Sequence, residues 1–139
     1  MKFERKNTIE ETEVYEDVVF KKTDSEIRNP DGSIVFSAKN IEIPEDWSQV
    51  AADVLAQKYF RKAGVPKALK KVHEEGVPIF LQRSTADKET LEKYIPEERY
   101  VSETTATQVF DRLAGAWAYW GWKGNYFDSE QDAKIYYDE

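Results

Sequence analysis

Short apolar runs separated by turn residues occupy the first part of the chain. Val18–Phe20 precedes the tetrapeptide NPDG at 29–32, in which proline presets φ and aspartate and glycine tolerate the tight positions of a turn. The β-branched and aromatic run Ser33–Phe36 follows directly. Two strand-like runs around such a turn predict a β-hairpin, which Ile41 and Ile43 can extend.

A helical period replaces this pattern after Pro44. Apolar residues recur at three- and four-residue steps, and Gly64 and Pro66 then form a stop signal, so the pattern predicts a helix over 45–62. Its apolar positions are Trp47, Val50, Ala51, Val54, Leu55 and Tyr59. A shorter helix is predicted over 66–73 and another over 87–94. The segment 77–81 is apolar but contains proline, which favours an extended, packed linker.

The last part of the chain predicts two more helices. Thr105 and Gln108 have the spacing of a capping box, and an apolar stripe continues from them until Gly121 and Gly124. The stripe consists of Ala106, Val109, Phe110, Leu113, Trp117 and Trp120. A further helix opens at Asp128 with Ala133, Tyr136 and Tyr137 on its apolar face. It reaches Glu139 without a glycine and without a lysine or arginine in its last turn, so we expect it to be truncated.

These elements define an α+β fold, an N-terminal β-hairpin or small antiparallel sheet followed by a mainly helical bundle of three to five helices. We expect residues 1–12 to be a polar, flexible leader and 13–139 to be a single module. Within it, 13–43 is the hairpin region and 44–139 the helical region. The expected core residues are Trp47, Leu55, Tyr59, Phe110, Leu113, Trp117 and Trp120.

Composition narrows the possible functions. The chain has 139 residues, no cysteine and one histidine, which excludes disulfides, thiolate metal sites and a cysteine nucleophile within these residues. We expect no metal site and no catalytic residue here, and His73 is most simply a surface residue. The net charge of −7 argues against nucleic acid as a partner bound by bulk charge. No apolar run is long enough to cross a membrane, so we expect a cytoplasmic protein without a membrane partner.

Two stretches are candidates for contact with a phosphate or a partner. The run 58–71 contains six cations and no acid, and the loop that follows the long helix is rich in aromatic residues. The candidates are Lys58, Arg61, Lys62, Lys67, Lys70 and Lys71, with Trp122 and Tyr126. A solvated helix face and core packing explain the same residues more simply.

Several of these stretches together resemble one known family. The runs NPDGSIVFSAKNIEIPEDWSQVAADVLAQKYFRKAGVP, ERYVSETTATQVFDRLAGAWAYWGWKGNYF and DSEQDAKIYYDE, in this order and spacing, are similar to the N-terminal segment of adenosylcobalamin-dependent (class II) ribonucleoside-diphosphate or -triphosphate reductases. The resemblance covers the chain from about Val14 to Glu139.

The resemblance implies a parent oxidoreductase that reduces ribonucleotides to deoxyribonucleotides. In that family adenosylcobalamin generates a thiyl radical on a cysteine, two further cysteines supply electrons, and this machinery sits on an α/β barrel. Because this chain has no cysteine, it departs from the catalytic pattern, and we expect it to be inactive alone. The expected role is a non-catalytic module, excised or from a divided reductase, that packs on the barrel of the same enzyme. The parent enzyme then binds the cofactor and the ribonucleotide, and this segment alone binds no cofactor.

An alternative from another class stays open. The chain can be a stand-alone module, regulatory or binding, that holds a nucleotide or single-stranded nucleic acid through the basic run 58–71 and the aromatic loop. Such binding should weaken with salt and with neutralisation of Lys62, Lys67 and Lys70.

Overall fold

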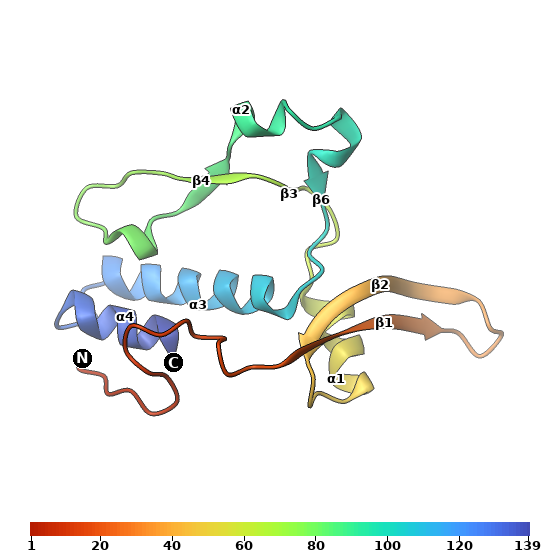
Figure 1. The fold of residues 1–139 in the computed structure, drawn as a ribbon, viewed down its shortest axis with the longest axis horizontal. Helices are drawn as coiled ribbons and strands as arrows, with labels where there is room; N and C mark the ends of the chain where they lie inside the picture. The colour runs from red at the N-terminus through yellow and green to blue at the C-terminus, as the bar shows by residue number, and fades with distance from the viewer. The chain divides into compact units, whose positions relative to one another are not determined.

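The computed structural model describes all residues from 1 to 139, and their contacts divide the chain into two compact units (Figure 1). The first unit consists of residues 1–17, 66–99 and 111–139, and the second of residues 18–65 and 100–110. Each unit is described by itself. The division into a leader over 1–12 and a single module over 13–139 stays a prediction.

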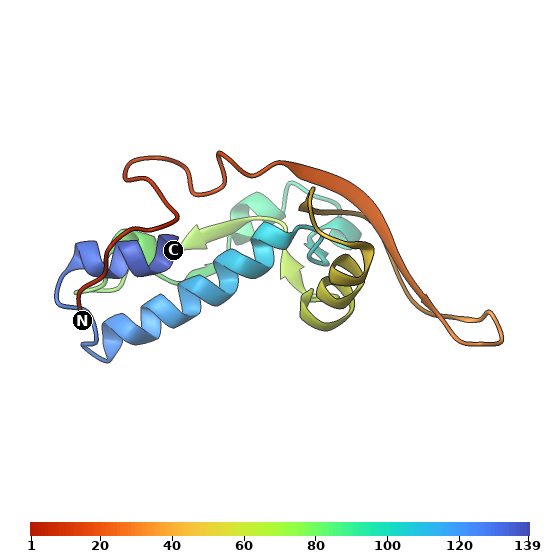
Figure 2. The same ribbon diagram turned by 90° about the horizontal axis from the view of Figure 1, so that it is seen from below.

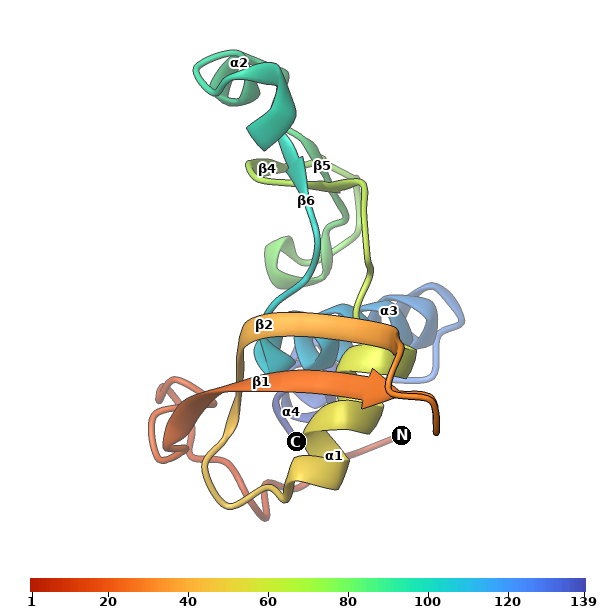
Figure 3. The same cartoon turned by 90° about the vertical axis from the view of Figure 1, so that its right-hand side faces the viewer.

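A long antiparallel hairpin forms the second unit's sheet (Figure 3). Strand β1 (Phe20–Arg28) pairs with β2 (Ile34–Pro44), and the amide of Asn29 donates to the carbonyl of Ser33 across the turn. Gly32 in that turn has a φ of +86°, a left-handed conformation that favours glycine. The hairpin predicted from the NPDG tetrapeptide is therefore confirmed.

Helix α1 begins later than the sequence pattern predicts. It covers Gln49–Val54, and Ser48 caps it by accepting from the amide of Ala51. The predicted start at residue 45 is wrong. The amide of Trp47 donates to the carbonyl of Pro44 and forms a separate turn, so the helix begins only after Ser48, which follows that turn and caps the helix. A single π-helical turn, η1 (Leu55–Tyr59), continues α1.

The second unit has its own core between the hairpin and α1. The buried side chains are Ile41, Ile43, Ala52, Leu55, Ala56 and Phe60. Trp47 packs edge-on against Phe110, with ring centroids 5.8 Å apart. The prediction that Tyr59 lies in the core is wrong, because η1 turns its ring outward and leaves it 53% exposed.

Short strands and turns occupy the stretch from 65 to 101. Their bounds are β3 (Val65–Pro66), β4 (Leu69–Lys71), η2 (Ile79–Leu81), β5 (Ser84–Ala86), α2 (Lys88–Leu91), η3 (Pro96–Glu98) and β6 (Tyr100–Val101). The predicted helix over 66–73 is wrong, because β4 pairs with β5 instead and leaves Leu69 exposed. The predicted linker over 77–81 contains the 3₁₀ turn η2. The helix predicted over 87–94 is confirmed as the shorter α2, capped by Asp87.

Two helices close the chain. Helix α3 (Ala106–Lys123) starts with the predicted capping box: Thr105 Oγ1 accepts from the amide of Gln108, and Gln108 Oε1 accepts from the amide of Thr105. Helix α4 (Glu130–Asp138) is capped by Ser129. Residues of α3 up to Phe110 belong to the second unit and those from Asp111 to the first.

The core of the first unit lies beside α3 and α4. Val77, Leu81, Ala118 and Ala133 are buried there, and half-buried rings surround them. These rings are Phe80, Tyr119, Trp122, Phe127 and Tyr137. The prediction that Trp117 and Trp120 are core residues is wrong: their side chains are 52% and 64% exposed. Ala118 is buried in this core instead, and the missing side chain of Gly121 leaves room for the ring of Phe127.

The first eight residues run along α4 (Figure 2). The terminal ammonium of Met1 donates to the carbonyl of Tyr126, and Arg5 forms an ion pair with the buried carboxylate of Asp138 at 2.9 Å. The ring of Phe3 packs against those of Phe127 and Tyr136 at 5.8 and 5.3 Å. We name residues 1–8 the N-terminal strap. Whether residues 1–12 are flexible in solution stays a prediction.

The elements together form the predicted α+β fold, with a small antiparallel sheet followed by four α-helices. None of the helices combines the length and the apolar character needed to span a bilayer. A cytoplasmic location stays a prediction.

Candidate functional site

Three of the six candidate cations lie in the second unit. Lys62 makes its contacts within this unit. Its Nζ donates to the carbonyls of Ala56 and Gln57 in η1 and lies 4.4 Å from the ring centroid of Phe36. A lysine at a helix C-terminus satisfies carbonyls that have no partner in the helix. Lys58 is exposed within η1.

Arg61 stands at a hollow in the same unit. Its backbone amide donates to Oε2 of the buried Glu103 at 2.8 Å, whereas its guanidinium has no hydrogen-bond or ion-pair partner. The hollow has a volume of about 250 Å³ and lies between β2, the end of η1 and residues 102–104. Phe36 and Phe60 line it together with the side chain of Arg61. The arrangement offers an apolar wall beside a free cation.

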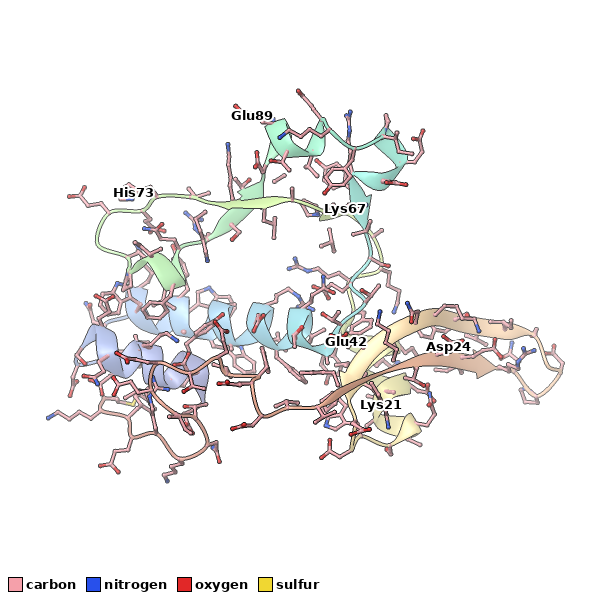
Figure 4. All side chains as sticks on the ribbon, in the orientation of Figure 1. Lys21, Asp24, Glu42, Lys67, His73 and Glu89 are labelled. Atoms are coloured by element: carbon pink, nitrogen blue, oxygen red, sulfur yellow. The ribbon has the colours of Figure 1, made fainter.

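The other three candidate cations lie in the first unit. Lys67 reaches Glu98 at 3.5 Å and the ring of Tyr94 at 4.6 Å, and Lys71 donates to the carbonyl of Gln82 at 2.8 Å. Lys70 is exposed on β4. Figure 4 shows Lys67 at the start of this stretch and His73 in the loop beyond it. Because three of the cations belong to each unit, neither unit carries the whole basic run as one surface.

Trp122 and Tyr126 have different environments. The indole Nε1 of Trp122 donates to the carbonyl of Gly76 at 2.7 Å, and the half-buried ring packs against the core of the first unit. Tyr126 is 60% exposed and makes no such contact with the core. The prediction that Trp122 lies in the loop after the long helix is wrong, because α3 continues to Lys123; Trp122 is a packed ring of α3, and Tyr126 is an exposed ring of the loop.

Glu74 was not singled out by the sequence, yet it collects polar contacts from three side chains of the first unit. Its carboxylate accepts from Lys123 Nζ at 2.8 Å and from the hydroxyl of Tyr119 at 2.8 Å, and Arg83 lies 3.5 Å away. The hydrogen bond from Lys123 is the main reason that the pKa of Glu74 is lowered, and the one from Tyr119 adds to it. No local sequence pattern predicts this cluster, because its members are up to 49 residues apart along the chain.

The Glu74 cluster borders an open hollow of about 730 Å³ that includes His73, Glu75 and Trp122. Through Tyr119 and Lys123 the Glu74 carboxylate holds its loop against α3. The geometry supports a structural ion-pair network and not an acid–base pair.

The donor set of the chain does not fit a cobalt centre. No three His, Cys, Asp or Glu side chains are grouped so that they could hold a metal ion, and the one imidazole, His73, is exposed in a loop. The chemistry of a cobalamin cofactor is thus not assigned to any residue of this chain. That the segment alone binds no cofactor stays a prediction.

Comparison with known proteins identifies the family. The model of the N-terminal domain of class II vitamin B12-dependent ribonucleotide reductases matches residues 21–139. The chain therefore belongs to the N-terminal domain family of class II vitamin B12-dependent ribonucleotide reductases, as the sequence resemblance indicates. It is 60% identical over 139 residues to the vitamin B12-dependent ribonucleotide reductase of Bradyrhizobium diazoefficiens and 59% identical over 139 residues to that of Agrobacterium fabrum.

The match to a more distant relative is shorter. The vitamin B12-dependent ribonucleotide reductase of Streptomyces clavuligerus is 28% identical over 113 residues, or 80% of this chain. All of this chain aligns with the two closer relatives, but it spans only 11% of their length. Most of a reductase in this family is therefore polypeptide outside residues 1–139.

Proposed function

We propose that this chain is a non-catalytic N-terminal module of a cobalamin-dependent ribonucleotide reductase whose parent converts ribonucleotides to deoxyribonucleotides. The observation that carries the proposal is a family match over residues 21–139 combined with a sequence that contains no cysteine. The thiyl-radical chemistry implied by the family resemblance needs cysteines, so the reacting residues lie in the remainder of the parent.

The module's partner is then the catalytic barrel of the same reductase. Ribonucleotide and adenosylcobalamin bind to that barrel. The structure supports this division of labour, because the candidate site residues are saturated by internal contacts or are exposed without a convergent reactive group. The expected contribution of residues 1–139 is to pack against the barrel.

The proposal is tested by assaying two polypeptides, the full-length reductase that carries this segment and residues 1–139 alone. Each is incubated with adenosylcobalamin, a dithiol and ribonucleoside di- or triphosphates, and deoxyribonucleotide is quantified. We expect product from the full-length chain only. Product from residues 1–139 alone would contradict the non-catalytic role, and none from the full-length chain would contradict the activity of the parent.

A second candidate function rests on the hollow at Arg61. A free guanidinium beside Phe36 and Phe60 matches the chemistry of a nucleotide, with a phosphate on the cation and a base on the apolar wall. Binding of ATP and dATP to residues 1–139 is measured by calorimetry at two salt concentrations, with Arg61→Gln as the variant and Arg83→Gln as the control. The candidate requires salt-dependent binding that Arg61→Gln abolishes and the control retains.

A further inference from the structure

Helix α3 carries aromatic rings on two opposite sides of its second half. On one side Tyr119 and Trp122 pack on the core of the first unit, and both have hydrogen-bond partners, Glu74 and the carbonyl of Gly76. On the other side Trp117 and Trp120 are more than half exposed. Neither of these two indole nitrogens has a hydrogen-bond partner.

Trp117, Trp120 and Tyr126 are three exposed rings in the last two turns of α3 and the turn that follows it. The two tryptophans are three residues apart, which places them on the same face of a helix. Tyr126 is exposed in the turn after α3, and its ring lies beside Gly124, whose amide donates to the carbonyl of Trp120. We name these three residues the aromatic surface.

This surface has the chemistry of a protein contact. Tryptophan and tyrosine join a large apolar area to one hydrogen-bonding group, and they are enriched among the residues that dominate binding energies. Monomeric proteins rarely expose such rings together. Neither the hollow at Arg61 nor the one at Glu74 is lined by these three residues, so the exposed rings belong to neither of them.

The occupant follows from the length of the relatives and from charge. The chain spans 11% of the relatives' length, so in each relative some eight times as much polypeptide is tethered to this segment. A tethered partner binds at a high effective concentration. A second copy of this chain is a poorer partner, since two copies with a net charge of −7 repel each other.

We propose that the aromatic surface, Trp117, Trp120 and Tyr126, is where this module docks on the remainder of the reductase polypeptide. This inference rests on the proposed function and adds the residues that make the contact. The rings insert into an apolar recess of the partner, and the two indole N–H groups donate to acceptors there.

Hydroxyl-radical footprinting tests the proposal, because it reports oxidation at single side chains. Residues 1–139 and the full-length reductase are oxidised under identical conditions, the former at a concentration where sedimentation shows a monomer. We expect oxidation of Trp117, Trp120 and Tyr126 to fall at least tenfold in the full-length chain. Equal oxidation in the two polypeptides overturns the proposal.

A substitution series provides the second measurement. In the full-length reductase, Trp117→Ser combined with Trp120→Ser should raise the rate of proteolytic release of the module at least tenfold. Tyr100→Ser, which removes a half-exposed ring of the other unit, is the control and should leave the rate unchanged. An unchanged rate in the double variant overturns the proposal, and should that variant fail to fold, the footprint of the unsubstituted chain decides.

The docking surface and the proposed function can fail separately. Deoxyribonucleotide formation by the full-length chain with an unprotected aromatic surface would retain the reductase role and reject this docking site. Protection in residues 1–139 alone, at concentrations where the chain dimerises, together with no protection in the full-length monomer, would assign the surface to a second copy and also overturn the proposal.

Discussion

At the scale of the residue, Gly121 shows how the core of the first unit depends on a missing side chain. An added Cβ at Gly121 would lie 2.6 and 2.8 Å from two carbons of the Phe127 ring, closer than real Cβ contacts come. We therefore expect Gly121→Ala to lower the free energy of unfolding by about 1–3 kcal/mol, even though alanine favours a helix. Urea denaturation measures the change.

Gly115 on the same helix is the matched control. Its added Cβ would meet only one carbon of Tyr137, at 3.5 Å, which is ordinary contact. Gly115→Ala should therefore raise stability by about 0.5–1 kcal/mol through helix propensity. Destabilisation of both variants by the same amount would show that the Phe127 ring does not limit position 121.

A buried hydroxyl gives a second prediction at this scale. Ser25 on β1 is fully buried, and its Oγ donates to Oδ1 of Asp53 on α1 at 2.6 Å. Hydrogen bonds to charged acceptors contribute about 1.5–3 kcal/mol, so Ser25→Ala should lower the free energy of unfolding by a similar amount. Ser37→Ala on β2 changes an exposed serine and should be neutral. A neutral Ser25→Ala, in urea denaturation, would mean that this bond does not hold α1 on the hairpin.

Residue burial was the part of the structure that the sequence predicted least well. The spacing of Trp117 and Trp120 correctly places them on one face of α3, but periodicity alone cannot tell a face that packs inside this chain from one left free. The stripe of α1 has the same ambiguity: Leu55 is buried and Val50 on its other side is exposed. Apolar residues on both sides of a helix were interpreted as a single packed face.

At the scale of the element, local chemistry predicted the hairpin and the beginnings of α2 and α3, whereas it placed the beginning of α1 four residues too early. Thr105 and Gln108 form the expected capping box because both partners lie within one turn. Within the predicted helix over 66–73, Leu69–Lys71 instead form the strand β4, because β5 pairs with it from a distance along the chain that the local sequence does not reveal. The Glu74 cluster was missed for the same reason.

The N-terminal strap gives a prediction about pH. The carboxylate of Glu139 accepts from the Thr8 hydroxyl at 2.7 Å and from the backbone amides of Lys6, Asn7 and Thr8. The hydrogen bond from Thr8 and those from the amides lower its pKa from 4.5 to about 2. The charged carboxylate thus stabilises the strap above pH 4.5, and this contribution is lost as the pH falls through about 2.

Hydrogen exchange of the strap amides measures this effect. At neutral pH we expect Lys6, Asn7 and Thr8 amides to be protected, and Glu139→Gln to speed their exchange severalfold. Glu4→Gln changes an exposed carboxylate of the same segment and should leave exchange unchanged. Free exchange of these amides at neutral pH in the unsubstituted chain would instead support a flexible segment over 1–12.

At the scale of the whole molecule, the sequence was most informative about the family to which the protein belongs. The three runs that suggested class II reductases all lie inside the region that the family model matches, residues 21–139. The basic run 58–71 was less informative. A linear run of like charges predicts one patch only when its residues share one compact body, and here Val65 and Pro66 belong to different units.

The last prediction combines the charge of the whole molecule with its exposed rings. The chain carries a net charge of −7 at pH 7 and has an isoelectric point near 4.9, so repulsion between copies vanishes near pH 5. We expect residues 1–139 to sediment as a monomer at pH 7.5 and low salt, and to associate near pH 5 through Trp117, Trp120 and Tyr126. The strap stays closed at pH 5, because the pKa of Glu139 is about 2, so acid release of this segment does not cause the association.

Sedimentation velocity at several concentrations checks the prediction, with the Trp117→Ser/Trp120→Ser variant beside the unsubstituted chain. The variant should remain a monomer at pH 5 where the unsubstituted chain associates, and Tyr100→Ser should associate normally. Association of the double variant to the same extent would place the contact elsewhere, for example at the exposed Ile34 and Val35 of the hairpin. Such a result would mean that another apolar surface, and not the aromatic surface, joins copies of this module once the net charge is lost.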